Sequence, residues 1–572
     1  MATLAERQTT RAAQAPVTKP AVRSRSGLTT AALVLAVLVT RVPFMTQTLY
    51  GFDSANYALA VGRFYNVAFH QPHPPGYPLY VALARAFDLV LHDANRSLVV
   101  ESIGWSTLAV GCTVALGRRL YGSTAGLLAG FLLAFTVGFW GYGEVAYPYV
   151  ALAGETASLA LLAHLALAGH RRAVVAFGVA WAVAVGVRWD GAVFCVPLWV
   201  WLLWRPTWRL RVLSISLALA GVVAFAIPTV MLSGGWDTYR ATLSDYLRVW
   251  SPQSAFVVGD YASGGETQAG YNLNFLVNYL RQMLGVGLLL VPYLLGRRFG
   301  PASLAADGRS RFLAVWTLPP LLVYVFAHLG EPGYVLSLAP QAAILGACAA
   351  QDLGHEADVL ALVLRTRAGW FAPRLRAGAP VERPFSAASR PAHPRRATPA
   401  APPWDSRASA ASASRGVASA VTGLIVLAIV AWNVQAFLRG TGPGRLPDLR
   451  AHDLTTSAQV AFVQAQPRAS TLVLAHDMLR QVQFYVPEQR VELLYSEYLP
   501  GWERARTRTE LPEGTAQVVV LDSAVEVPPV DTSRVHEIVL RELPQRVSVW
   551  VVDVRGQRAV EHGYRYLKVL PI

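Results

Sequence analysis

The sequence predicts an all-α polytopic membrane domain, with about eleven transmembrane helices plus interfacial helices, followed by a small C-terminal α/β domain. Three observations support this fold class. The 572 residues are 53% hydrophobic and only 15% charged, whereas roughly a quarter of the residues of an ordinary soluble domain are charged. Apolar runs long enough to cross a bilayer recur along the chain. The last part of the chain instead alternates short apolar runs with turn residues, which is typical of strands in a small sheet.

The formal net charge of +15 comes from arginines that occur in short clusters between the apolar runs. Such clusters are typical of the cytoplasmic loops that orient a membrane protein, so the charge indicates topology and not binding to nucleic acid. The three cysteines, Cys112, Cys195 and Cys348, lie within apolar segments and have no metal-ligand spacing. They are expected to be small buried side chains.

Residues 1–27 form a basic tail that we expect on the cytoplasmic side, and residues 28–44 form the first expected span. A secretory signal is the alternative. No small-residue cleavage site follows the run, however, and Asp53 comes soon after it, so an uncleaved span is favoured. This orientation places Asp53 outside the cytoplasm.

Residues 77–91 are apolar but only about fifteen in number, against the roughly twenty that a spanning helix needs. If they crossed the membrane, every later arginine cluster would lie outside, contrary to the positive-inside rule. We therefore expect residues 77–91 to lie along the membrane surface or to re-enter it. The expected spans are then residues 28–44, 98–116, 123–140, 148–168, 173–187, 191–204, 212–232, 273–295, 312–328, 334–350 and 417–438.

These spans divide the chain into domains. Residues 28–350 form the predicted membrane domain, and residues 351–416, rich in Ala, Pro, Ser and Arg, are predicted to be a disordered basic cytoplasmic loop. The last span, 417–438, leads into an extracytoplasmic α/β domain at 439–572. A helix is expected at 453–465, and strands at 471–475, 491–495, 517–521, 537–540 and 547–552. Their spacing favours a partly parallel sheet. Gly-rich phosphate loops and zinc-ligand spacings are absent from the sequence of this domain, so a structural or acceptor-docking role is expected for it.

Polar residues gather on the predicted outer side of the membrane. They are Asp53, His70, His73, Glu144, Tyr147, Arg188, Asp190, Arg281, His328 and Glu331. Ionisable groups near hydrocarbon are costly and usually face a partner or a cavity. Their collection on one side predicts a shared polar pocket that opens outward.

The stretch after the first span carries the most specific pattern. Asp53 is followed by an amphipathic helix that contains Tyr57, and then by His-Pro-Pro-Gly-Tyr-Pro-Leu at residues 73–79. Together they resemble the membrane-embedded C-type glycosyltransferases, and most resemble the bacterial relatives of protein O-mannosyltransferases and of the aminoarabinose transferase that modifies lipid A. The resemblance covers roughly residues 28–350 and is strongest over residues 53–79. It implies an inner-membrane enzyme that transfers a sugar from a polyprenyl-phosphate-linked donor to a hydroxyl of a glycan, lipid or protein acceptor.

In that family the carboxylate of the first loop acts at the acceptor, so the resemblance implies that Asp53 is the catalytic general base. The chemistry supports this role, because a sugar hydroxyl is a poor nucleophile and a carboxylate that accepts its proton contributes about 10²–10⁴ in rate. The alternative is that Asp53 only caps the helix that follows it. Charge also builds on the leaving phosphate, and Arg188 or Arg281 could stabilise it.

The candidate substrate-binding residues are Tyr57, His73, Glu144, Tyr147, Arg188, Arg281 and Tyr334. Several have structural alternatives. His73 could be only a turn residue, Glu144 could lie in an aromatic belt at the membrane surface, and Arg188 could be an ion-pair partner of Asp190.

The sequence departs from the resemblance in two places. Ser54 follows Asp53 where protein mannosyltransferases have a glutamate, which argues against a protein acceptor. Glu331 precedes Tyr334 in a region where relatives often carry a basic residue, which argues against a phosphate contact there. The loop 233–272 holds six Trp and Tyr residues among four acids, a mixture that suits either carbohydrate recognition or an amphipathic interfacial segment.

No cofactor is certain. Some relatives use a divalent metal, but no closed set of ligands is visible in the sequence. Two alternatives to an enzyme remain, a transporter or flippase of lipid-linked sugars and a non-catalytic scaffold for envelope assembly. Transporters tend to contain internal repeats and broken helices at the bilayer midplane, whereas here the polar residues gather at one surface.

Overall fold

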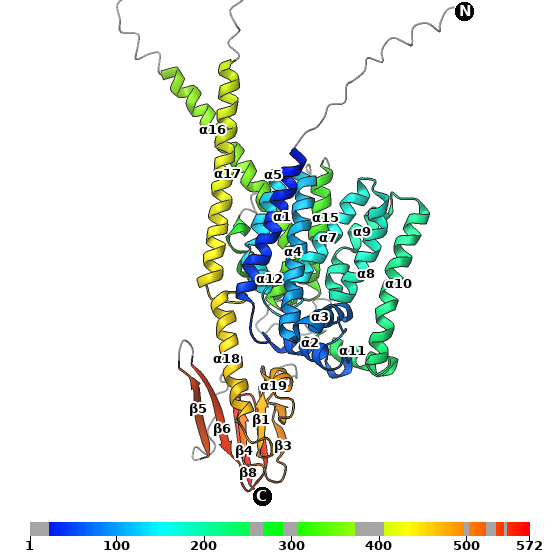
Figure 1. The fold of residues 1–572 in the computed structure, drawn as a ribbon, viewed down its shortest axis with the longest axis vertical. Helices are drawn as coiled ribbons and strands as arrows, with labels where there is room; N and C mark the ends of the chain where they lie inside the picture. The colour runs from blue at the N-terminus through cyan, green and yellow to red at the C-terminus, as the bar shows by residue number, and fades with distance from the viewer. Residues whose placement is uncertain are drawn as a thin grey trace, which may run out of the picture.

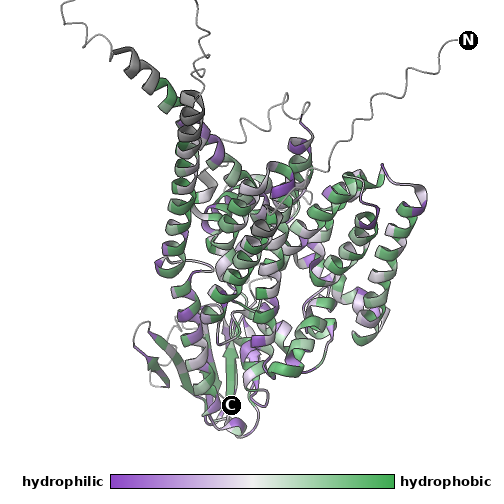
Figure 2. Ribbon diagram, turned by 45° about the horizontal axis from the view of Figure 1, so that its top comes forward, coloured by the Kyte–Doolittle hydropathy of each residue, from purple (hydrophilic) through white to green (hydrophobic). Residues whose placement is uncertain are grey.

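The computed structural model describes residues 22–250, 267–289, 307–371, 405–496, 503–521, 534–542 and 546–571. A bundle of helices forms the larger part of the fold, and a β-rich C-terminal region lies at one end of the bundle (Figure 1). The bundle helices are hydrophobic along most of their length (Figure 2). This is expected of helices that face both lipid and one another.

Seven helices in the described residues are long and apolar enough to cross a membrane. They are Gly27–Phe44, Ala94–Tyr121, Tyr149–Leu167, Arg171–Phe194, Trp208–Leu232, Pro332–Leu364 and Gly416–Arg439. The chain is therefore a multi-pass membrane protein. The predicted number of eleven spans is not confirmed.

The helices of the bundle follow one another in chain order. They are α1 (Val22–Arg41), α2 (Phe52–Gly62), α3 (Pro78–Leu91), α4 (Ala94–Tyr121), α5 (Ser123–Ala134), α6 (Val137–Tyr142), α7 (Tyr149–Leu167), α8 (Arg171–Phe194), α9 (Val196–Leu203), α10 (Trp208–Leu232), α11 (Trp236–Trp250), α12 (Gln268–Leu284), α15 (Gly308–Phe326), α16 (Ala339–Phe371) and α17 (Asp405–Arg439). Short 3-10 helices lie at η1 (Val42–Phe44), η2 (Val67–Phe69), η4 (Gly285–Leu289) and η5 (Pro332–Leu338).

The surface helix expected at 77–91 corresponds to α3. It has 14 residues and lies beside α2 at the end of the bundle nearest the C-terminal region (Figure 1). Tyr80, Val81 and Ala84 form its buried face, whereas Leu89 and Val90 are 79% and 78% exposed. An apolar face left open on a helix too short to span suits the interface of a membrane.

Helix α8 differs from the sequence expectation. Residues 173–187 and 191–204 were expected to be two spans, but α8 continues to Phe194 with one non-helical residue inside it, Arg188 (φ −153°, ψ 101°). The side chain of Arg188 is paired with Asp190 inside the protein. Two opposite charges that pair with each other can lie inside a membrane protein, away from the membrane surface. Arg188 and Asp190 therefore lie within one helix and do not mark a boundary between two spans.

The predicted cytoplasmic loop also has different ends. Helix α16 continues to Phe371 and α17 begins at Asp405, so half of the predicted loop, residues 372–404, lies outside the described residues. The two helices pack together where Thr422 donates its hydroxyl hydrogen to the carbonyl oxygen of Ala350 at 3.2 Å. Alanine is abundant at both ends of the predicted loop and has the highest intrinsic helix propensity. These ends are therefore helical, although their composition suggested disorder.

The C-terminal region begins with α18 (Leu446–Gln464) and contains two sheets. Its other elements are β1 (Thr471–Ala475), α19 (Leu479–Tyr485), β2 (Val491–Leu493), β3 (Thr507–Glu510), β4 (Gln517–Val520), β5 (Val535–Arg541), β6 (Val547–Asp553), β7 (Gln557–Gly563) and β8 (Tyr566–Pro571). The larger sheet has the order β2-β1-β4-β6-β5. Strand β1 is parallel to β2 and β4, and β6 is antiparallel to β4 and β5. The predicted small C-terminal region with a partly parallel sheet is confirmed.

The second sheet, β3-β7-β8, was not expected from the sequence. Strand β3 reads Thr-Arg-Thr-Glu, and only its third residue is buried. A strand with one buried side chain gives no apolar run for a sequence pattern to detect.

A separate apolar cluster holds α2, α3 and the start of α4 together. At its centre Tyr57 is 1% exposed and Tyr80 is fully buried, and Tyr239 of α11 and Phe484 of α19 pack against it. The stretch between α1 and α4 is therefore well packed. It contains Asp53, Tyr57 and His73, which the sequence analysis identified as candidate site residues.

Candidate active site

Asp53 lies in the first turn of α2. The N-cap residue of this helix is Gly51, and no side chain caps it, so Asp53 does not serve as the cap. A carboxylate in the first turn still benefits from the partial positive charge of the helix N-terminus. Its side chain is 34% exposed, which leaves the carboxylate open to a ligand.

His73 is the ionisable neighbour of Asp53. Its Nδ1 lies 3.4 Å from Oδ1 of Asp53, and its Nε2 lies 3.3 Å from the hydroxyl oxygen of Tyr77. The imidazole also stacks on Tyr246 of α11, with ring centroids 6.1 Å apart. Burial lowers the pKa of His73, and the charge of Asp53 opposes this only in part. The imidazole is therefore neutral near pH 7.

The backbone of the loop before α3 is held by neighbouring hydroxyl groups. Tyr65 donates to the carbonyl oxygen of Gly76 at 2.8 Å, and Tyr239 donates to that of Pro75 at 3.0 Å. Gly76 has φ +122°, and a Cβ there would lie 2.5 Å from the Tyr65 hydroxyl oxygen, so only glycine fits. The peptide bonds 71–72 and 74–75 are cis. The two tyrosine hydrogen bonds hold the backbone of the loop that places His73 beside Asp53.

Arg188 joins the same group of residues from α8. Its Nε donates to Oδ2 of Asp190 at 3.0 Å, and the residue is only 2% exposed. The guanidinium lies 4.5 Å and 4.7 Å from the ring centroids of Tyr149 and Tyr334, and 6.0 Å from that of Tyr77. The ion pair with Asp190 is therefore real. Tyr77 lies between this cation and His73, so Asp53, His73, Arg188 and Tyr334 form one continuous cluster.

Tyr57 and Tyr147 lie at the edges of this cluster. The ring of Tyr57 packs edge-on against Tyr77 and is 5.5 Å from that of His73, but it is buried. The hydroxyl oxygen of Tyr147 lies close to Gly51, since a Cβ added to Gly51 would be only 2.6 Å from it. Tyr147 therefore touches the backbone just before Asp53.

Glu144 and Arg281 are placed differently. Glu144 is fully buried, and its carbonyl oxygen accepts from the amide and the hydroxyl of Thr46 at 3.0 Å each. Its carboxylate has no hydrogen-bond partner among the described residues. Arg281 lies in the last turn of α12 with its side chain exposed, and no described contact brings it to Asp53 or His73. Substrate binding by these two residues stays a prediction.

Three further residues belong to the cluster but were not expected individually. Tyr77 and Tyr246 contact His73. Tyr77 belongs to the motif at residues 73–79, and Tyr246 lies in the aromatic-rich loop 233–272. Glu155 of α7 is 2% exposed, and a Cβ on Gly191 would lie 2.1 Å from its Oε2. A single glutamate within an apolar run was the signal that could have identified it.

Metal binding has no support from the described residues, where no group of three or more His, Cys, Asp or Glu side chains could hold an ion. An apolar cavity in the bundle lies apart from Asp53. It is lined by Leu132, Thr136, Leu284, Gly287, Ala339, Ala342, Ala343, Gly346, Ile429 and Asn433. This lining contains no ionisable side chain.

Residues 72–233 match the protein family described as dolichyl-phosphate-mannose-protein mannosyltransferase. The matched segment includes His73, Tyr77 and Arg188 and begins after Asp53. It spans less than half of the chain. A search of the curated proteins finds no match.

Solved structures are similar at low sequence identity. ArnT from Cupriavidus metallidurans bound to undecaprenyl phosphate is 13% identical with a TM-score of 0.54, over 93% of this chain and 98% of that chain. The same protein in its apo state is 15% identical with a TM-score of 0.51, over 93% and 98%. AglB from Archaeoglobus fulgidus, in complex with an inhibitory peptide and a dolichol-phosphate, is 12% identical over 87% of this chain and 69% of that chain. Its TM-score is lower, at 0.40. Together, the family match and the ArnT fold confirm the resemblance indicated by residues 53–79.

Proposed function

We propose that this chain, a membrane protein with the fold of the C-type glycosyltransferases, transfers a sugar from a polyprenyl-phosphate carrier to an acceptor hydroxyl on the extracytoplasmic side. The observation that carries the proposal is the placement of Asp53. Its carboxylate is one-third exposed, at 34%, and lies 3.4 Å from a buried imidazole. A ligand can reach the carboxylate, and the imidazole can orient it.

Asp53 is the general base in this proposal. The acceptor hydroxyl donates a hydrogen bond to the carboxylate, and its oxygen attacks C1 of the donor sugar. As the new C1–O bond forms, the hydroxyl proton passes to Asp53. The bond between C1 and the phosphate oxygen breaks, and polyprenyl phosphate leaves with the electron pair.

His73 orients the base. The Tyr77 hydroxyl can donate to Nε2 of His73, which leaves the proton of the neutral imidazole on Nδ1. This nitrogen lies 3.4 Å from Oδ1 of Asp53 and forms no hydrogen bond within the described residues. A neutral imidazole beside the carboxylate leaves its negative charge in place, so the carboxylate stays basic. His73 is therefore a positioning residue in this scheme.

The leaving phosphate requires positive charge or hydroxyl donors as its own charge increases. Arg188 already has Asp190 as an ion-pair partner, which reduces what it can offer to a phosphate. The tyrosines around it, Tyr149 and Tyr334, can donate hydrogen bonds. Arg281 is exposed and no ion pair is found for it in the described residues, so it is the better candidate for direct contact with phosphate.

The arrangement of the loops supports the proposed side of the membrane. The connections α4–α5, α7–α8 and α9–α10 lie at the end of the bundle away from the C-terminal sheets (Figure 1), and Arg205 donates to the carbonyl oxygen of Leu167 there at 3.5 Å. These connections carry the clusters Arg118–Arg119 and Arg171–Arg172. Basic loops favour the cytoplasm, and this supports an extracytoplasmic position for α2 and Asp53.

The test compares cells that lack the gene with cells that carry the wild-type chain, Asp53→Asn or Asp93→Asn. The masses of glycan, lipid and protein fractions are measured. The wild-type chain is expected to restore a sugar-sized mass that the deletion removes, and Asp53→Asn is expected to fail at an equal level of membrane-inserted protein. Asp93→Asn is the matched control, because Asp93 is the N-cap of α4 and asparagine caps a helix equally well.

Two results would contradict the proposal. Restoration of the mass by Asp53→Asn would remove Asp53 from the mechanism. An unchanged mass in every fraction after deletion would overturn sugar transfer itself.

A further inference from the structure

The segment that leads to Asp53 has no regular secondary structure. It comprises residues 45–51, between η1 and α2, and is called the linking segment below. Four consecutive amides in it, those of residues 46 to 49, all donate to groups outside the segment. Thr46 donates to the carbonyl oxygen of Glu144 at 3.0 Å, and the other three donate to side chains of the C-terminal region.

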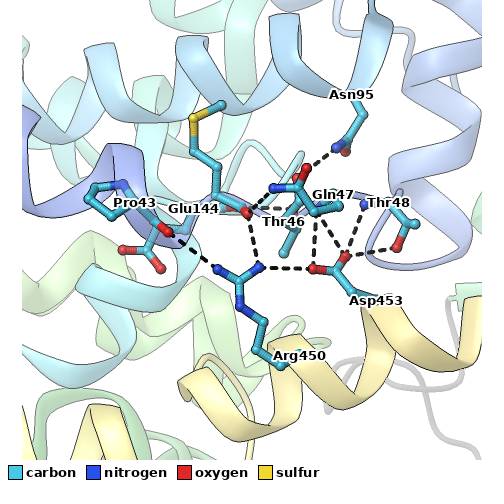
Figure 3. Close-up of polar contacts among 9 residues, drawn as sticks. Pro43, Thr46, Gln47, Thr48, Asn95, Glu144, Arg450 and Asp453 are labelled. Carbon is cyan, nitrogen blue, oxygen red and sulfur yellow. Dashed lines mark hydrogen bonds and ion pairs between the residues drawn. The ribbon is translucent and has the colours of Figure 1, made fainter. Parts of the chain in front are cut away.

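Asp453 of α18 is the centre of these contacts (Figure 3). Its carboxylate accepts from the amide of Gln47 at 3.0 Å and 3.1 Å, and from the amide and the hydroxyl of Thr48 at 2.9 Å each. The residue is 6% exposed. A buried carboxylate that accepts several hydrogen bonds forms one of the stronger polar contacts in a protein.

Other side chains of α18 and α19 complete the contact. Arg450 donates to Asp453 at 3.2 Å and to the carbonyl oxygens of Met45 and Pro43 at 3.3 Å each. The amide of Leu49 donates to the hydroxyl oxygen of Tyr485 at 3.0 Å. Burial raises the pKa of Tyr485 to about 12, so this hydroxyl is not ionised at neutral pH.

Helix α19 also contacts both ends of α2. At the start of α2, the guanidinium of Arg480 lies 5.6 Å from the ring centroid of Phe52, the residue before Asp53. At its end, Arg63 donates to the carbonyl oxygens of Gln483 and Phe484 at 2.7 Å and 3.1 Å. The C-terminal region therefore holds α2 at both ends and the linking segment that precedes it.

Helix α2 has no side-chain cap at its start, so the contacts of the linking segment hold the backbone that leads into Asp53. We propose that Asp453 is a positioning residue for the transfer reaction, since its buried carboxylate binds the backbone of the linking segment and so sets the place of Asp53. This inference rests on the proposed function. It gives the C-terminal region a part in catalysis, although its residues do not touch the reacting atoms.

The experiment uses the full-length chain in lipid nanodiscs, as wild type and as Asp453→Ala. Hydrogen exchange is measured over residues 46–49. Exchange at Gln47 and Thr48 should rise about tenfold or more when their acceptor is lost, while Thr46, held by Glu144, should change less. Transfer is measured with membranes of a strain lacking the gene, which supply donor and acceptor. The maximal rate should fall about 10- to 100-fold, as for a base displaced by about 1 Å, and the half-saturating amount of membranes should stay within about twofold.

The matched control is Asp553→Ala. Asp553 belongs to the same region, but its carboxylate bonds to Arg555 and not to the linking segment. It should leave both the exchange of residues 46–49 and the maximal rate at wild-type values. If Asp453→Ala does not insert, Asp453→Asn tests the same contact, because asparagine keeps one acceptor oxygen and loses the other. Exchange at Gln47 or Thr48 should then rise, and the maximal rate should fall with it.

The outcomes separate the two proposals. Faster exchange with an unchanged maximal rate would overturn the positioning role and leave the proposed function intact. Unchanged exchange would overturn the contact itself. A wild-type chain that transfers no sugar would overturn the proposed function, and the positioning role would fall with it even if exchange at Gln47 and Thr48 rises.

Discussion

His70 illustrates how neighbours change the chemistry of a single residue. It lies three residues before His73 in the same loop. Burial and the nearby charge of Arg480 lower the pKa of His70 to about 4, although the carboxylate of Asp53 opposes the shift. The ordinary pKa of a histidine is about 6.5, so the folded protein holds this imidazole neutral over a range in which the unfolded chain protonates it.

This difference predicts a loss of stability in acid. Between about pH 6.5 and about pH 4 the unfolded chain binds more protons at this site, so stability rises with pH and falls on acidification. The midpoint of thermal unfolding in detergent should therefore be lower at pH 5 than at pH 7. In His70→Gln the fall should be smaller, though not absent, because burial also lowers the pKa of His452 and His73.

His536→Gln provides the control for that experiment, since this imidazole is exposed on β5. It should keep the wild-type dependence on pH. An equal fall in His70→Gln and wild type would mean that His70 does not contribute.

At the scale of elements, α8 depends on the side chains at its kink. Arg188 and Asp190 are 2% and 6% exposed, and their ion pair lies against three tyrosine rings. Glu155 of α7 lies beside the same stretch of backbone, where a Cβ on Gly191 would meet it. Two acids and one cation therefore share a site with little access to water.

Removal of the cation should destabilise the fold strongly. Arg188→Met leaves Asp190 buried without its partner, and breaking a buried ion pair in this way costs about 3–5 kcal/mol. The double variant Arg188→Met with Asp190→Asn should recover part of the loss, because no unpaired charge of Asp190 remains. The measurement is the unfolding midpoint in detergent.

The control variant is Arg172→Met, an exposed arginine in the first turn of the same helix. It should shift the midpoint little, since exposed charges contribute little to stability. If Arg188→Met were no worse than Arg172→Met, the buried ion pair would not be a stabilising feature of α8.

At the scale of the whole molecule, the basic connections and the C-terminal sheets occupy opposite ends of the bundle (Figure 1). A cysteine in place of Asp477, whose side chain is 84% exposed, should react with an impermeant thiol reagent added to intact cells after the outer barrier is opened. A cysteine in place of Arg171 should react only after the membrane that holds the protein is permeabilised. Cys195 and Cys348 are buried, which limits the background.

The reverse pattern of labelling would invert the proposed topology and place Asp53 in the cytoplasm. The acceptor would then have to be cytoplasmic as well, and the proposal of an extracytoplasmic acceptor would fail.

The sequence by itself determined the features that depend on local pattern. Apolar runs identified the multi-pass membrane domain, alternating apolar residues identified strands such as β1 and β4, and the motif at residues 53–79 indicated the C-type fold. It also identified Asp53 and His73 as separate candidate site residues. Each of these signals lies within a short stretch of chain, where side-chain periodicity and turn chemistry act directly.

Only the tertiary structure decided how distant stretches complete the site. The carboxylate of Asp453 binds the amide of Thr48 across 405 residues of sequence. The guanidinium of Arg188 contacts tyrosine rings from the N-cap of α3, from α7 and from η5. Sheet β3-β7-β8 forms because β3, which has one buried residue, pairs with β7, which is about fifty residues further along the chain. Such contacts depend on how packed elements approach in space, and a pattern read along one stretch of chain carries no information about that approach.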